Sequence, residues 1–209
     1  MKTSYIITSY IEGGFANLSS IDESDFVICA DGGYEIALSQ NIMPDIVIGD
    51  SDSGKMQPVK PGKTKFIHHE KEKDESDTFL CVKHAVELGF KEITILGGIG
   101  GRLDHTISNI QTLAHFTNLT DSIFLKDEGN LVTVIENSKV ALSKTEGFAL
   151  SLFSLSDKCS GVTVKGLKYP LKNAELNNSY PIGLSNGFIG DRASIEVKNG
   201  KLLIVLSKE

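Results

Sequence analysis

The sequence predicts two domains of different fold class: a doubly wound α/β domain with a mostly parallel sheet over residues 1–121, and a β-sandwich domain over residues 122–209. Two observations lead to this prediction. Short apolar runs alternate with helical patterns in the first part of the chain, which is typical of α/β domains. The helical patterns end near residue 122, and from there only short strand-like runs recur.

The predicted strands of the first domain are continuous apolar runs. They lack a regular alternation of polar and apolar residues, which indicates strands covered on both faces, as in a parallel sheet. We expect these strands over residues 4–8, 26–30, 46–49, 64–69 and 92–97.

Helical patterns fall between or after these strands, over residues 34–41, 76–89 and 103–116. In the second pattern, Ser76 or Asp77 is the expected N-cap and Gly89 the C-terminal stop. An apolar stripe at helical spacing is expected to face the core. The stripes are Phe79, Val82, Val86 and Phe90 in the second helix, and Leu103, Ile107, Ile110 and Ala114 in the third.

The predicted strands of the second domain are short, and they recur over residues 131–136, 139–143, 148–155, 162–167 and 193–207. The last run contains Asn199-Gly200 between alternating residues, a pattern that predicts a β-hairpin.

Composition narrows the classes of function. The net charge is −6 and no Lys/Arg-rich run occurs, which argues against nucleic acid or an anionic membrane as the main partner. The first residues read as a strand and not as a signal peptide. Cys29, Cys81 and Cys159 are far apart, so neither a disulfide framework nor a zinc site is indicated. We therefore expect a protein of the reducing cytoplasm.

Polar clusters follow four consecutive predicted strands of the first domain. Because ligands gather at the carboxyl ends of strands in open α/β sheets, the carboxylates of these clusters are expected to converge on one rim. Repulsion between them would be relieved by Mg²⁺, a hard cation that prefers oxygen ligands and substrate phosphates. Asp50 and Asp52 are expected to bind the magnesium ion. The converging residues are Asp31, Asp50, Asp52, Asp74, Asp77 and Asp104.

The glycine-rich stretch over residues 97–105 predicts a phosphate site. Its glycines allow close approach of backbone to phosphate, the following helix offers its N-terminus, and Arg102 adds a planar donor fork. His105 and Asn109 lie one helical turn apart on the same face. Each motif also has a purely structural alternative. Asp-x-Asp could stabilise a turn, the glycines could form a tight turn, and Asp74 or Asp77 could cap a helix.

These motifs together resemble the bacterial thiamine pyrophosphokinase family. The resemblance rests on Asp-Gly-Gly at 31–33, Gly-Asp-Ser-Asp-Ser at 49–53, "EKDESDT" at 72–78 and "GGRLDH" at 100–105. It continues in the second domain with "GLKYPLKNAEL" at 166–176 and "GLSNGF" at 183–188, so it spans most of the chain.

The resemblance implies a homodimer with active sites between subunits, and transfer of pyrophosphate from Mg-ATP to the hydroxyl of thiamine, giving thiamine diphosphate and AMP. The chemistry of this transfer makes Asp77 or Asp104 a candidate to accept the hydroxyl proton, and the resemblance implies catalytic and metal-binding roles for Asp50, Asp52, Asp77 and Asp104. It implies thiamine binding by Ser185 and Asn186. The predicted nucleotide-binding residues are Asp31, Gly32, Gly33, Ser53, Asp74, Gly100, Gly101, Arg102, His105 and Asn109.

Two departures from the family pattern are visible. Ser76 stands where the family usually has Thr, which retains the hydroxyl. The chain has no Trp, so Tyr169, Phe188 or another aromatic residue would have to stack on thiamine.

Three alternatives stay open at this point. They are a pterin pyrophosphokinase of related fold, a phosphatase with Asp50 as nucleophile, and a module that binds Mg-ATP without turnover. The phosphatase is disfavoured because such nucleophiles normally follow the first strand of the domain, whereas Asp50 follows the third.

Overall fold

The computed structural model describes residues 3–12, 14, 16–50, 64–70 and 74–209. The chain divides into two compact units, Met1–Glu128 and Gly129–Glu209. No helix within the described residues is long and apolar enough to cross a membrane.

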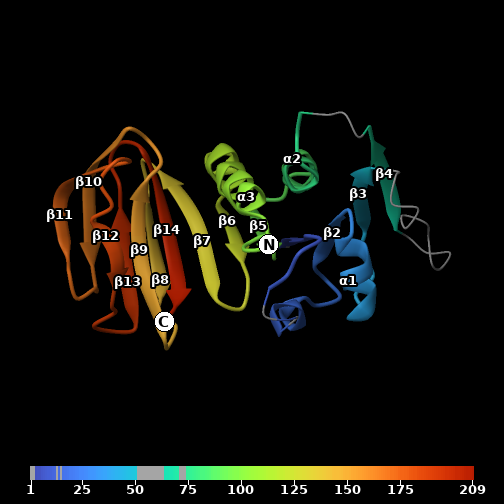
Figure 1. The fold of residues 1–209 in the computed structure, drawn as a ribbon, viewed down its shortest axis with the longest axis horizontal. Coiled ribbons are helices and arrows are strands. Elements are labelled where there is room, and N and C mark those ends of the chain that lie inside the picture. The colour runs from blue at the N-terminus through green and yellow to red at the C-terminus, as the bar shows by residue number, and fades with distance from the viewer. Residues whose placement is uncertain (1–2, 13, 15, 51–63, 71–73) are drawn as a thin grey trace. The chain divides into compact units, whose positions relative to one another are not determined.

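The first unit is an α/β domain with a parallel sheet (Figure 1). Neighbouring strands pair in parallel in the order β6-β5-β1-β2-β3-β4. The strands are β1 (Ser4–Ile7), β2 (Phe26–Ala30), β3 (Ile46–Asp50), β4 (Lys65–His69), β5 (Glu92–Leu96) and β6 (Ser122–Lys126). The helices are the 3₁₀ helix η1 (Ala16–Ser20), α1 (Gly33–Ser39), α2 (Asp77–Glu87) and α3 (Leu103–Phe116). The α/β class predicted for this part of the chain is confirmed.

Strands β1, β2 and β3 are largely buried because their apolar residues pack on both faces of the sheet. Ile7, Val27, Cys29 and Val47 form one core cluster with Leu18 of η1 and with Tyr34 and Ala37 of α1. Alternate strand residues such as Ile6, Ile28 and Ile48 point to the other face and are also buried. Helix α2 contacts β1, β2 and β3, and it lies beside α3 (Figure 1).

Strand β1 is the point where the order in which strands are added to the sheet reverses. From β1 the chain adds β2, β3 and β4 on one side, and it then returns through α2 to add β5 and β6 on the other side of β1. In open α/β sheets the crevice at such a switch point is where ligands bind.

The expected division at residues 121 and 122 lies before β6, whereas the division in the structure lies after it. Ser122 to Lys126 pair in parallel with Glu92 to Leu96, so β6 extends the first sheet. Strand β6 follows α3 after a short connection and has an alternating burial pattern. From its sequence it resembled the strands of the second domain and was grouped with them.

The buried face of α3 differs from the expected apolar stripe. Leu103 is 72% exposed and Ile107 is 50% exposed. The buried residues are instead Asn109, Thr112, Leu113 and Phe116. Polarity does not prevent burial here, because the Asn109 amide donates to Gly98 O at 2.8 Å and the Thr112 hydroxyl donates to Ser108 O at 2.9 Å.

The second unit consists of two antiparallel four-stranded groups, as expected for a β-sandwich. One has the order β12-β9-β14-β7, and the other has the order β11-β10-β13-β8. The strands are β7 (Asn130–Glu136), β8 (Lys139–Ser143), β9 (Phe148–Ser154), β10 (Lys158–Lys165), β11 (Leu171–Asn177), β12 (Gly183–Asn186), β13 (Arg192–Glu196) and β14 (Lys201–Lys208). Strands β11 and β12 were not predicted, since they are largely polar and exposed.

The β-hairpin predicted around Asn199-Gly200 is wrong. Strand β13 pairs with β8 and β10, whereas β14 pairs with β7 and β9. The backbone N–H groups of Lys198 and Asn199 both donate to Ser160 O at 3.1 Å, which holds the connection against β10. The turn therefore carries the chain from one set of strands to the other.

Candidate active site

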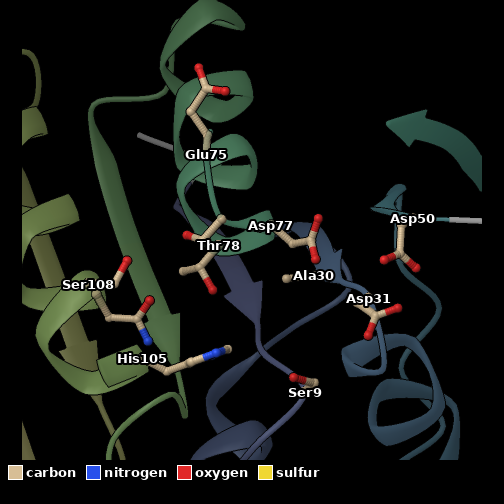
Figure 2. A pocket seen from close by; sticks show the side chains of 11 residues that line it. Ser9, Ala30, Asp31, Asp50, Glu75, Asp77, Thr78, His105 and Ser108 are labelled. Carbon is tan, nitrogen blue, oxygen red and sulfur yellow. The ribbon is translucent and has the colours of Figure 1, made fainter. Parts of the chain in front are cut away.

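A cavity of about 340 Å³ lies at the carboxyl ends of β1, β2 and β3, and the starts of α2 and α3 face it (Figure 2). It is thus on the rim where the polar clusters were expected to meet. The described residues that line it are Ser9, Ala30, Asp31, Asp50, Glu75, Ser76, Asp77, Thr78, His105, Ser108 and Asn109.

Three of the predicted carboxylates line this cavity: Asp31, Asp50 and Asp77. Asp31 directly follows β2, Asp50 is the last residue of β3, and Asp77 is the first residue of α2. Figure 2 shows the carboxylates of Asp50 and Asp77 directed toward the same space, with Asp31 below them. Residues from three separate segments are therefore brought together, although within the described part of the chain no three His, Cys, Asp or Glu residues are close enough to hold a metal ion.

Asp31 adopts a left-handed backbone conformation, with φ of 46°. Its N–H donates to Ile48 O at 2.8 Å, and its carbonyl oxygen accepts from Tyr34 N at 3.1 Å. Aspartate tolerates this conformation better than most residues. The turn from β2 into α1 is therefore tied to β3, which places the Asp31 carboxylate beside Asp50.

The start of α2 is fixed by a capping residue that also lines the cavity. The Ser76 hydroxyl accepts a hydrogen bond from Phe79 N at 3.2 Å, as expected for an N-cap. This cap determines where the first helical residues, Asp77 and Thr78, lie. The lining residue Glu75, by contrast, points away from the three aspartates in Figure 2.

Helix α3 presents His105, Ser108 and Asn109 to the cavity. These residues are three and four positions apart and therefore share a face. Figure 2 shows the His105 ring directed toward Ser9, which follows β1. Asn109 is buried, and its side-chain amide donates to Gly98 O at 2.8 Å. Two of the predicted nucleotide-binding residues, His105 and Asn109, are thus at the cavity.

Five polar lining residues were not predicted as site residues: Ser9, Glu75, Thr78, Ser108, and Ser76, which was predicted only as a helix cap. Ser9 stands at the end of a strand, as Asp31 and Asp50 do, and this signal was available. Ser108 lies three residues after His105, so helical spacing also could have indicated it.

Arg102 and Asp104 form an ion pair outside the described residues that line the cavity. The Arg102 guanidinium donates to both Asp104 carboxylate oxygens, at 3.1 and 2.5 Å. Both side chains are exposed. The hydrogen bond from Arg102 lowers the pKa of Asp104, and the same bond raises the pKa of Arg102. The structure therefore pairs these two predicted site residues with each other and does not bring Asp104 to the other carboxylates.

The glycine-rich loop over residues 97–101 uses several of its amides within the protein. Gly97 N donates to Lys126 O at 2.9 Å, and Gly98 N donates to Tyr10 O at 2.7 Å. Gly100 N donates to the Thr106 hydroxyl at 3.1 Å. Gly100 and Gly101, both predicted to bind nucleotide, have positive φ angles of 83° and 58°. The tight packing of this loop thus accounts for its glycine content.

Five further predicted site residues belong to the first unit. Gly32 and Gly33 lead into α1, where a Cβ on Gly33 would lie 2.1 Å from Ile7 O, so glycine is required there. Asp74 is exposed, and it lies outside the set of described lining residues. Asp52 and Ser53 lie outside the described residues.

The predicted thiamine residues, Ser185 and Asn186, belong to β12 in the second unit. Asn186 forms two hydrogen bonds with the backbone of Tyr169: its Oδ1 accepts from Tyr169 N at 3.0 Å, and its Nδ2 donates to Tyr169 O at 2.7 Å. Tyr169 is 62% exposed, whereas Phe188 is half-buried. Ser185 has a φ of 53°, and its N–H donates to the Ser151 hydroxyl at 3.0 Å.

Comparisons with known proteins agree with these two units. The family model described as thiamin pyrophosphokinase, catalytic domain, matches residues 18–125, and the model described as thiamin pyrophosphokinase, vitamin B1 binding domain, matches residues 137–202. Thiamine pyrophosphokinase of Bacillus subtilis is 28% identical, with both sequences covered completely. Thiamin pyrophosphokinase 1 of Caenorhabditis elegans is 27% identical over 79% of this chain and 72% of the relative.

Solved structures show the same likeness. The crystal structure of the Bacillus subtilis enzyme matches with a TM-score of 0.90 at 27% identity and covers both chains completely. The thiamin pyrophosphokinase structure from Geobacillus thermodenitrificans has a TM-score of 0.87 at 23% identity, covers 99% of this chain and 98% of its own, and supports the fold. The resemblance predicted from the motifs is thus confirmed. Because the catalytic-domain model alone matches more than half of the chain, the protein belongs to the thiamine pyrophosphokinase family.

Proposed function

We propose that this protein transfers the pyrophosphoryl group of ATP to the hydroxyl of thiamine, giving thiamine diphosphate and AMP. The observation that carries the proposal is the cavity at the carboxyl ends of β1, β2 and β3, where Asp31, Asp50 and Asp77 converge in a chain of this family. Thiamine is a cation, so an acidic cavity also suits the acceptor.

The residues at the cavity fit a magnesium ion. Mg²⁺ is usually held by one or two carboxylates together with substrate phosphates, and it keeps several waters. Asp50 and Asp77, which are directed toward the same space, supply such a pair, and Asp52 is proposed as a further ligand. When bound, Mg²⁺ would offset the negative charge that develops on the phosphate oxygens.

Other residues would bind and orient the nucleotide. The ion pair of Arg102 with Asp104 is exposed to solvent, and such pairs contribute little to stability. The Arg102 guanidinium can therefore exchange the Asp104 carboxylate for a phosphate at small energetic cost, since both are bidentate partners. Of the two candidates to accept the thiamine proton, Asp77 lines the cavity, which favours it over Asp104.

The second unit is proposed to bind thiamine. Tyr169 is the more exposed of the two aromatic residues considered for stacking, and a tyrosine ring can stack on a cationic heterocycle. Both polar groups of the Asn186 amide already bond to the Tyr169 backbone. We therefore propose that Asn186 acts by positioning Tyr169. Homodimerisation and a cytoplasmic location are also part of the proposal.

The direct test is to incubate the protein with ATP, Mg²⁺ and thiamine, and to measure AMP and thiamine diphosphate. Both products are expected in equal amounts. Phosphate release without AMP would instead indicate a phosphatase, and calorimetric titration with a pterin acceptor would detect the pterin alternative. A stoichiometric ATP complex without turnover in the presence of thiamine would indicate a binding module.

Replacing one cavity carboxylate tests the site. Asp50→Asn is expected to abolish turnover while the circular dichroism spectrum and melting temperature are retained. Asp191→Asn, at an exposed aspartate of the second unit, is the matched control and should keep full activity. An Asp50→Asn variant with near-normal turnover would refute the role of Asp50.

A further inference from the structure

The loop over residues 97–101, which joins β5 to α3, packs closely against its surroundings. Its four glycines all have positive φ, between 58° and 84°. A Cβ on Gly97 would lie 2.3 Å from Tyr10 O, and one on Gly98 would lie 2.4 Å from Asn109 Nδ2. The amides of Gly97, Gly98 and Gly100 all donate within the protein, so the loop is held at three points.

Two side chains of α3 hold this loop at separate points. The Asn109 amide donates to Gly98 O at 2.8 Å, and it is buried, with 4% of its surface exposed. The Thr106 hydroxyl accepts from Gly100 N at 3.1 Å. Thr106 and Asn109 are three residues apart, so both project from one side of the helix.

The same turns of α3 carry the cavity residues His105, Ser108 and Asn109. We propose that the loop over residues 97–101 braces the first two turns of α3 against the segment after β1 and the end of β6, and that Thr106 and Asn109 are positioning residues for the nucleotide site. The proposal rests on the proposed function, since it takes the cavity as the ATP site.

Two roles can be distinguished by experiment: bracing of α3 by the loop, and direct contact with the nucleotide. Asn109 lines the cavity, so a substitution there affects both possibilities. Thr106 contacts the loop but lies outside the described residues that line the cavity. A Thr106 variant therefore tests the brace by itself.

The experiment compares Thr106→Val, which removes the hydroxyl, with Thr106→Ser, which retains it. Thr112→Val is the matched control, because the Thr112 hydroxyl bonds to a carbonyl of its own helix, at Ser108, and within the described residues forms no hydrogen bond to the loop. The measurements are the Kd for Mg-ATP by calorimetry, and the KM for each substrate and kcat in the coupled assay.

Thr106→Val is expected to raise the Kd and KM for ATP by roughly threefold to tenfold, the range that loss of one hydrogen bond produces. Thiamine KM and kcat should stay within about twofold, because the brace affects ATP binding equally in the ground and transition states. Thr106→Ser and Thr112→Val should stay within about twofold in all constants.

Asn109→Asp removes the donor to Gly98 O and should weaken ATP binding as well. Since both variants act on one loop, the double variant should lose less affinity than the product of the two single losses.

An unchanged Kd for ATP in Thr106→Val would overturn the brace, and so would an equal loss in Thr112→Val or an equal rise in thiamine KM. Weaker ATP binding in Asn109→Asp alone would show direct contact and would also overturn it. If wild-type protein binds ATP but forms no thiamine diphosphate, the proposed function fails while the brace is still decided by the Kd values. A wild-type protein that binds no ATP overturns both.

Discussion

Replacing Leu113 by alanine tests which face of α3 is buried. Leu113 is 0% exposed. Replacement by alanine removes three buried carbons and so lowers the free energy of unfolding by about 2.4 kcal/mol, at about 0.8 kcal/mol for each. The cavity that is left raises the total loss to about 3 kcal/mol. With an unfolding entropy of about 2.1 cal/mol/K per residue, this lowers Tm by about 11 °C if the first unit, Met1–Glu128, melts alone. The fall is about 7 °C if all 209 residues melt together.

The assay is thermal unfolding followed by circular dichroism and calorimetry, with Leu103→Ala as the control. Leu103 is in the same helix but is 72% exposed, so its replacement should change stability by at most about 0.5 kcal/mol, or about 2 °C. The apolar stripe read from the sequence predicts the opposite order, because it contains Leu103 and omits Leu113. Equal shifts in the two variants, or a larger shift in Leu103→Ala, would refute the burial argument.

Three further predictions concern single groups. Burial raises the pKa of the Cys29 thiol, and Cys81 and Cys159 are also buried; we therefore expect a thiol reagent at pH 8 to leave the folded protein unmodified and to label three thiols after denaturation. The Arg102 hydrogen bond lowers the pKa of Asp104, so the stabilisation from this pair is present above the ordinary value of 3.8 and is lost as pH falls through the lowered pKa. Arg102→Gln should raise the Asp104 pKa toward that value in an NMR titration, and an unchanged pKa would contradict the pairing. Asn186→Ala should raise the KM for thiamine by roughly threefold to tenfold through loss of its two bonds to Tyr169, with the KM for ATP unchanged; equal changes in both constants would argue against positioning of Tyr169.

Much of the candidate site could be predicted because its residues stand at the ends of strands. A continuous apolar run identifies a buried strand, and the carboxyl end of such a strand lies at the ligand-binding rim whatever the order of strands in the sheet. Asp31 and Asp50 were found in this way, and Asp77 was found from its place at a helix start. Asp104 was grouped with them by the same reasoning. It instead forms an ion pair with Arg102, two residues away in the sequence, and this local pair holds its side chain on the surface.

The sequence by itself determined the order and class of the two domains, the starts of the helices, and the residues at the strand ends. These features depend on local preferences and on neighbours close in the chain, such as the Ser76 cap of α2. Only the tertiary structure decided which face of α3 is buried, which partners the two strands beside the Asn199-Gly200 turn pair with, and that Asn186 bonds to Tyr169. Each of these depends on partners distant in sequence, and a buried polar group such as Asn109 is stable only when such a partner satisfies its hydrogen bonds.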